Sequence, residues 1–369
     1  MTIGRTAWRM PLLAAGLASM ACGIWLGLVR LGWSLPLPWP DQLIAHGPLM
    51  VCGFVGTLVG VERAVGFGSR WAYAAPALTA SGAMTIALHR VGPFGPWLIT
   101  AGSAVMVVIF AAICRRQPSL FALTMAVGAV AWAVGNVQWA AGASIYQVVF
   151  CWVAFLVLTI AGERLELNRV LRPTALAQGT FVAAMTIVVA GVAAAAWWPE
   201  PGVRLLGAGL IAATAWLARN DVARRTIRQR GVTRFMAICL LGGYAWLGAG
   251  GAMAAVFAAA TPGVLYDATL HAVFLGFVMS MIFAHAPVIF PAVLGVSFTF
   301  RPISYAHVAV LHLSLMFRVV GDLVDVLGRW RVWGGLLNAA AVLLFLISTV
   351  SSINFAAMRT SHPRTSRTP

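Results

Sequence analysis

Four of the seven histidines and two charged residues share one otherwise apolar stretch: His271, His285, His307, His312, Arg318 and Asp322. Ionisable side chains are costly at membrane depth and usually face the interior of a helical bundle. Imidazole binds iron and copper, and the arginine fork pairs with carboxylates. The stretch therefore predicts a haem or metal site inside a bundle.

The composition predicts an all-α, polytopic integral membrane protein. Of the 369 residues 61% are hydrophobic and only 9% are charged, and the mean hydropathy is +0.90. Soluble chains carry about 25% charged residues. The net charge of +16 comes from arginine alone, because the sequence has no lysine. Short basic loops beside a lipid bilayer account for this charge, so no nucleic-acid partner is expected.

Apolar runs of about 17 to 25 residues mark membrane spans. Twelve are predicted, at 10–31, 43–67, 71–89, 95–114, 118–140, 145–162, 174–198, 202–218, 233–259, 267–294, 302–324 and 333–355. Nineteen of the 25 arginines then fall on the side of the N-terminus, five on the other side, and Arg318 within a span. The positive-inside rule places both termini in the cytoplasm. We expect one transmembrane domain over 1–359 and a disordered tail over 360–369.

The helical rise separates the polar side chains into two layers. The outer layer holds His46, His271, Arg318 and Asp322. The inner layer holds Glu62, His285 and His307, with His312 between the layers. The histidine-bearing spans also echo each other, since Gly53-Phe54-Val55 follows His46 and Gly276-Phe277-Val278 follows His271.

The outer layer suits a haem. Two imidazoles from separate helices at one depth can be the axial ligands, and an arginine beside them can pair with the propionates. His46, His271 and Arg318 meet this description.

The three remaining intramembrane histidines, His285, His307 and His312, could bind copper or a second haem. The five-residue step from His307 to His312 turns them about 140° apart on one helix, so we expect at most one of them to join His285.

Alternatives stand beside these assignments. A single intramembrane histidine can equally serve packing or a hydrogen bond. Glu62 and Asp322 are candidates for proton handling or for an ion pair. The five cysteines occur singly in apolar segments and are interpreted as packing residues.

His46-Gly47-Pro48-Leu49-Met50 with Gly53-Phe54, and His271-Ala272 with Leu275-Gly276, resemble the NnrS family. That family comprises twelve-span haem- and copper-containing membrane proteins linked to denitrification and nitric oxide stress, distantly similar to the main subunit of haem–copper oxidases. The resemblance implies a multi-pass protein of the bacterial inner membrane with haem b, copper as a further cofactor, and nitric oxide or another diatomic ligand. His285-Ala286-Pro287 departs from the family's pattern.

Three functions remain open. The first is redox or nitric oxide handling at a haem, with a redox partner or quinone; if the protein is an enzyme, it is a haem/copper membrane oxidoreductase. The second is a secondary transporter that uses the intramembrane His, Arg and Asp residues. The third is a membrane anchor subunit of a redox complex.

Overall fold

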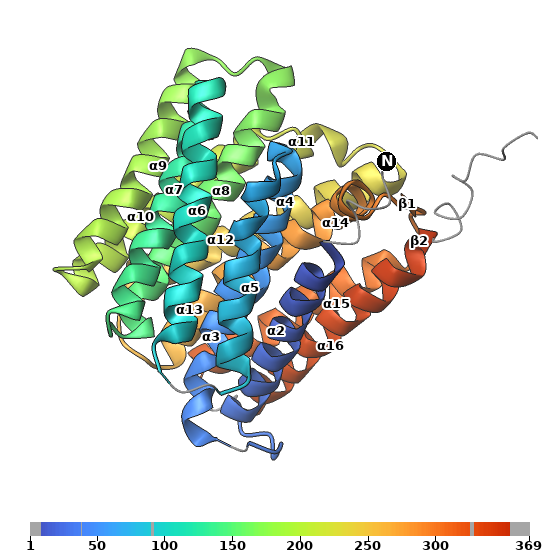
Figure 1. Ribbon diagram of the computed structural model, residues 1–369. Helices are drawn as coiled ribbons and strands as arrows, with labels where there is room; N and C mark the ends of the chain where they lie inside the picture. The colour runs from blue at the N-terminus through green and yellow to red at the C-terminus, as the bar shows by residue number, and fades with distance from the viewer. Residues whose placement is uncertain (1–8, 38, 90–91, 325–327, 355–369) are drawn as a thin grey trace, which may run out of the picture.

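The computed structural model describes residues 9–37, 39–89, 92–324 and 328–354, and these are almost entirely helical (Figure 1). The α-helices are α2 (Arg9–Arg30), α3 (His46–Pro48), α4 (Thr57–Phe67), α5 (Ala74–Ala87), α6 (Phe94–Arg116), α7 (Leu120–Ala140), α8 (Ile145–Leu167), α9 (Ala175–Ala195), α10 (Pro199–Asn220), α11 (Ala223–Thr226), α12 (Gly231–Phe257), α13 (Val264–His271), α14 (Met279–Leu294), α15 (Ser304–Leu323) and α16 (Gly328–Ser352). Short 3-10 turns η1 (Pro40–Ala45), η3 (Arg70–Tyr73) and η4 (Asn168–Leu171) lie between them. The strands β1 (Ser297–Phe298) and β2 (Ile353–Asn354) form one small antiparallel pair. The all-α prediction is confirmed.

Eleven helical stretches in the described part of the chain are long and apolar enough to cross a membrane. Each overlaps one of the twelve predicted spans. The other prediction, 71–89, falls on η3 and α5, and α5 has only 14 residues. A span needs about 20 residues, so α5 alone falls short of that length, and helices of sufficient length match eleven of the twelve predicted spans in the described part of the chain. The predicted tail 360–369 lies outside the described residues.

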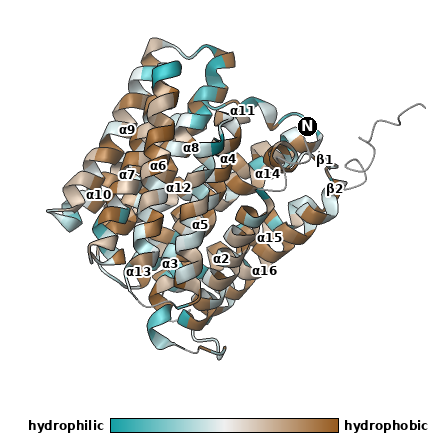
Figure 2. Cartoon of the chain, viewed as in Figure 1, coloured by the Kyte–Doolittle hydropathy of each residue, from teal (hydrophilic) through white to brown (hydrophobic). Residues whose placement is uncertain are grey.

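Helices that follow each other in the chain pack together, namely α5 with α6, α6 with α7, α7 with α8, α9 with α10, and α15 with α16. Short connections between them allow this arrangement. Local capping supports it, because Ser144 caps the start of α8 in a box with Gln147. Figure 2 shows apolar residues along most helix lengths and polar residues concentrated towards helix ends and connections.

Two helices are interrupted by π-helical segments, in which backbone hydrogen bonds skip one extra residue. Between α3 and α4 lies η2 (Leu49–Gly56), and between α13 and α14 lies η5 (Ala272–Val278). These two interrupted helices and α8 are the most buried candidate spans. In an apolar 18-residue segment of each, 67%, 67% and 78% of the residues are buried. Helix α2 packs on η2, and α12 packs on η5. The interrupted helices therefore form the centre of the bundle.

Candidate cofactor site

Each central helix carries a histidine at the point where its π-helical segment begins. His46 opens α3 just before η2, and His271 is the last residue of α13 before η5. The Gly-Phe-Val triplets that echo each other in the sequence lie within these two segments. Segments of this kind are rare and often occur at functional sites, because the wider turn re-aims the neighbouring side chains.

The rings of His46 and His271 lie close to each other within the bundle. Their centroids are 6.1 Å apart, and their planes differ by 18°. A ligating nitrogen lies about 2 Å from its metal and about 1 Å from its ring centre, so two imidazoles on opposite sides of one ion have centroids about 6 Å apart. The observed separation therefore suits an ion held between the two rings.

Backbone carbonyls hold both rings through the same atom. Nδ1 of His46 donates to the carbonyl oxygen of Gly23 at 2.7 Å, and Nδ1 of His271 donates to that of Asp267 at 2.8 Å. With the proton on Nδ1, a neutral imidazole carries its free lone pair on Nε2. A backbone carbonyl on the second nitrogen is the usual way to orient a metal-ligating histidine. Both histidines are thus arranged as Nε2 ligands.

The two histidines line one cavity with an empty volume of about 1210 Å³, counted with its open mouth. Its walls come from α2, α3, η2, α8, α13, η5, α15 and α16 and are mostly apolar. Close to His46 the wall is Gly27, where a Cβ atom would lie 2.9 Å from the ring carbon Cε1. Arg318 also lines this cavity, so the structure brings together the three residues predicted to bind a haem.

Two polar groups of the cavity lining lack partners. Nε of Arg318 and Nδ2 of Asn338 are buried without a hydrogen-bond partner. Asn338 uses its other side-chain atom, Oδ1, to accept from Ser314 at 2.6 Å. A buried donor without a partner costs about 1–3 kcal/mol, and an oxygen-bearing ligand would remove that cost. The two donors therefore suit a ligand that presents carboxylates near Arg318.

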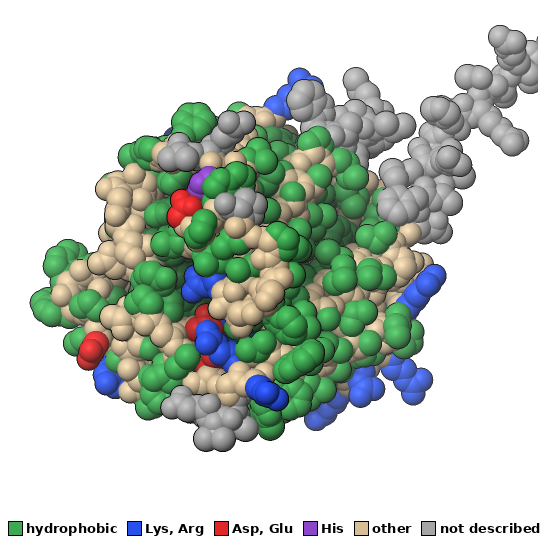
Figure 3. Space-filling model, turned by 90° about the horizontal axis from the view of Figure 1, so that it is seen from below, with side chains coloured by type: hydrophobic (Ala, Val, Ile, Leu, Met, Phe, Trp, Pro, Cys, Tyr) green, Lys and Arg blue, Asp and Glu red, His purple; other side chains and the backbone are tan. Residues whose placement is uncertain are grey.

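A carboxylate that sequence reasoning missed organises this end of the cavity. Oδ2 of Asp267 lies 2.7 Å from Arg318, 3.5 Å from Nδ1 of His271 and 3.9 Å from Arg331. Arg331 also forms an ion pair with Asp322 at 2.8 Å. Figure 3 shows acidic and basic side chains close together near the middle of the face seen from below. The only sequence signal for Asp267 is its position four residues before His271, one helical turn away.

A second cleft of about 650 Å³ lies between α4, α8 and α14. It is lined by Glu62, Glu163 and His285 together with apolar side chains. Val55 and Val278 line both this cleft and the cavity of His46. The structure thus places Glu62 and His285 of the predicted inner layer together, and Glu62 forms an ion pair with Arg63 at 2.9 Å.

The other two histidines of that set lie elsewhere. His307 packs edge-on against Phe283 and Phe345, with Nδ1 3.1 Å from Ser348. Nδ1 of His312 accepts from the indole of Trp246 at 3.0 Å.

Within the residues that the structure describes, no three His, Cys, Asp or Glu side chains are placed to hold a metal ion. His307 and His312 line neither the cavity of His46 nor the second cleft, and each is hydrogen-bonded to a different neighbour. Copper stays a prediction.

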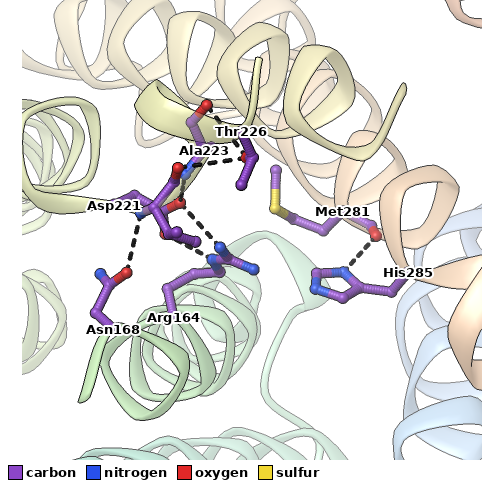
Figure 4. A network of polar contacts seen from close by, with 8 residues as sticks. Arg164, Asn168, Asp221, Ala223, Thr226, Met281 and His285 are labelled. Atoms are coloured by element: carbon purple, nitrogen blue, oxygen red, sulfur yellow. Dashed lines mark hydrogen bonds and ion pairs between the residues drawn. The ribbon is translucent and has the colours of Figure 1, made fainter. Parts of the chain in front are cut away.

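A buried ion pair near the second cleft was also missed. Arg164 donates to both carboxylate oxygens of Asp221, at 2.6 and 2.8 Å (Figure 4). Asp221 also caps α11 through the backbone N–H of Ala223 at 2.7 Å. The pair joins the end of α8 to the connection after α10. In the sequence Asp221 resembles an ordinary acid in a basic loop.

The family model described as "Domain of unknown function (DUF8744)" matches residues 9–354. The chain belongs to this family. The match takes in every helix described above, including both interrupted helices of this DUF8744 chain. No curated protein matches the sequence.

Proposed function

We propose that this DUF8744 chain is an integral membrane protein that binds one haem b between His46 and His271. The observation that carries the proposal is the paired imidazole geometry. Both rings lie in one cavity with their centroids 6.1 Å apart, and each Nδ1 is held by a backbone carbonyl. Two Nε2 lone pairs are left for axial ligation.

When bound, the haem would supply reversible one-electron transfer and, once an imidazole has moved aside, a place for a diatomic ligand such as nitric oxide. Arg318 and Asn338 would hold the propionates through their unpartnered donors. Asp267 would fix Arg318 and the ring of His271 in place. The apolar walls would exclude water and sheath the macrocycle.

The finer parts of the proposal rest on the sequence. The arginine distribution over the twelve predicted spans supports an orientation with both termini in the cytoplasm. The NnrS resemblance supports a location in the bacterial inner membrane. The NnrS resemblance of the two histidine motifs supports a role in nitric oxide handling, with copper as a further cofactor.

The first prediction is a Soret band in protein purified from haem-replete cells. His46→Ala and His271→Ala should each abolish or strongly reduce haem retention, because each variant lacks one of the two axial ligands. The matched control is His89→Asn, since His89 stacks on Trp39 away from the cavity and its φ of 50° suits Asn.

Absorption spectra and the pyridine haemochrome assay check the result. A colourless wild-type protein from haem-replete cells contradicts the proposal. If that protein also transports a substrate into vesicles, the transporter alternative gains support. Copurification of a soluble redox subunit instead supports the anchor alternative.

A further inference from the structure

The second cleft has a chemical character of its own. His285 and two carboxylates, Glu62 and Glu163, border it, and the rest of its lining is almost wholly apolar. Glu62 lies in the middle of α4 and Glu163 lies just before the last turn of α8. The cleft reaches Val55 and Val278 in the π-helical segments.

The imidazole and the two carboxylates that line this cleft offer hydrogen-bond acceptors. Nδ1 of His285 donates to the carbonyl oxygen of Met281 at 2.7 Å, which leaves Nε2 as an acceptor (Figure 4). The carboxylates of Glu62 and Glu163 share the guanidinium of Arg63 and keep further acceptor sites. A matching ligand has an apolar body and carries hydroxyl or N–H donors.

The cleft also adjoins the cavity of His46 and His271. Val55 and Val278 line both the cleft and the cavity, so they form part of the wall that separates the two. A molecule in the cleft would therefore lie next to a haem in the cavity. This position favours a ligand that exchanges electrons with the haem over a ligand that is only buried in the cleft.

We propose that the cleft binds the ring of a membrane hydroquinone, which delivers electrons to the haem. The inference rests on the proposed haem function. One hydroxyl of the ring donates to Nε2 of His285 and the other to the carboxylate of Glu163. The apolar side chains of Leu156, Ile282 and Phe290 surround the rest of the ring.

The redox step balances with these groups. Oxidation of one hydroquinone breaks two O–H bonds and yields one quinone, two protons and two electrons. His285 Nε2 and the carboxylate of Glu163 accept one proton each. Because each protein would hold one haem, which accepts one electron, the two electrons of one hydroquinone would reduce the ferric haems of two protein molecules.

The test is anaerobic stopped-flow reduction of the haem-loaded protein in nanodiscs by decylubiquinol. His285→Leu and Glu163→Gln should slow haem reduction by about tenfold or more, because each removes a hydrogen bond to a strong acceptor. Both should keep the Soret band and full reduction by dithionite. Glu166→Gln is the matched control, since Glu166 pairs with Arg169 in η4 and does not line the cleft.

Binding is measured separately by tryptophan fluorescence in the double variant His46→Ala/His271→Ala. The hydroquinone should still bind this haem-free protein, and His285→Leu in the same background should weaken binding. Dodecylamine serves as the competing probe, because a carboxylate cleft could instead hold an ammonium group.

Each failure points to one proposal. A colourless wild type defeats the haem assignment, and the fluorescence titration then decides the cleft alone. Three results each overturn the hydroquinone site. The first is a normal Soret band without haem reduction by decylubiquinol, and the second is an equal rate of haem reduction in His285→Leu and wild type. The third is binding of dodecylamine but not of the hydroquinone.

Discussion

At the scale of single residues, Asp267 connects the polar groups of the cofactor cavity. Its side chain is 17% exposed and pairs with Arg318, while its carbonyl oxygen orients His271. Buried charges contribute little net stability as pairs, but an orphaned partner is costly. The carboxylate therefore matters most as the group that keeps two arginines satisfied inside an apolar bundle.

Asp267→Asn should lower the free energy of unfolding by about 3 kcal/mol, because Arg318 and Arg331 lose the carboxylate that they share. Thermal unfolding in detergent, followed by circular dichroism, measures the effect. Asp41→Asn is the control, since the side chain of Asp41 is 76% exposed. Equal melting of Asp267→Asn and wild type contradicts this role.

The position of individual residues along a helix could be predicted from the sequence, but the residues that they contact could not. His46, His271 and Arg318 were placed in one layer from helical rise, and the structure brings them to one cavity. His307 was assigned to the layer of His285, yet it packs among Phe283 and Phe345. The rise is a property of the chain, whereas the direction of a side chain depends on which helix lies beside it.

At the scale of elements, the π-helical segments set the geometry of both cavities. In η5, Gly276 packs directly against the indole of Trp246, so an added Cβ would collide with the ring. Trp246 in turn donates to His312 at 3.0 Å. Close approach of α12 to η5 therefore depends on a residue without a side chain at this position.

Gly276→Ala should destabilise the protein by about 1–3 kcal/mol, because overpacking forces the indole or the backbone to move. The haem content should fall as well, since η5 follows His271 directly. The melting temperature and the Soret absorbance per protein check both effects. Gly66→Ala is the matched helix control, since a Cβ there meets nothing within 4 Å. Full haem loading of Gly276→Ala would show that η5 tolerates the shift.

Sequence reasoning could not foresee the π-helical segments. The triplets Gly53-Phe54-Val55 and Gly276-Phe277-Val278 lie within them, but a wider turn leaves no periodicity signal in so short a run. Their formation depends on packing against α2 and α12. For this reason the spans predicted from the sequence at 43–67 and 267–294 are continuous helices without an interruption.

At the scale of the whole molecule, the proposed orientation in the membrane gives a direct prediction. In cysteine-free protein in intact cells, Ala141→Cys after α7 should react with a membrane-impermeant maleimide. Gln229→Cys in the basic connection before α12 should react only after the membrane is opened. Both positions are exposed, so accessibility to solvent does not limit either reaction. Labelling of Gln229→Cys alone in intact cells would reverse the orientation.

The sequence by itself determined the all-α class of the protein, the approximate course of its helices and the positions of its histidines along them. These properties depend on composition and on local helical geometry, which neighbouring elements change little. Only the tertiary structure decided that Asp267 joins His271 to Arg318, that Glu163 meets His285 at the second cleft, and that His307 and His312 point elsewhere. Those outcomes depend on helix rotation and pairing, which are set by packing between segments distant in the chain.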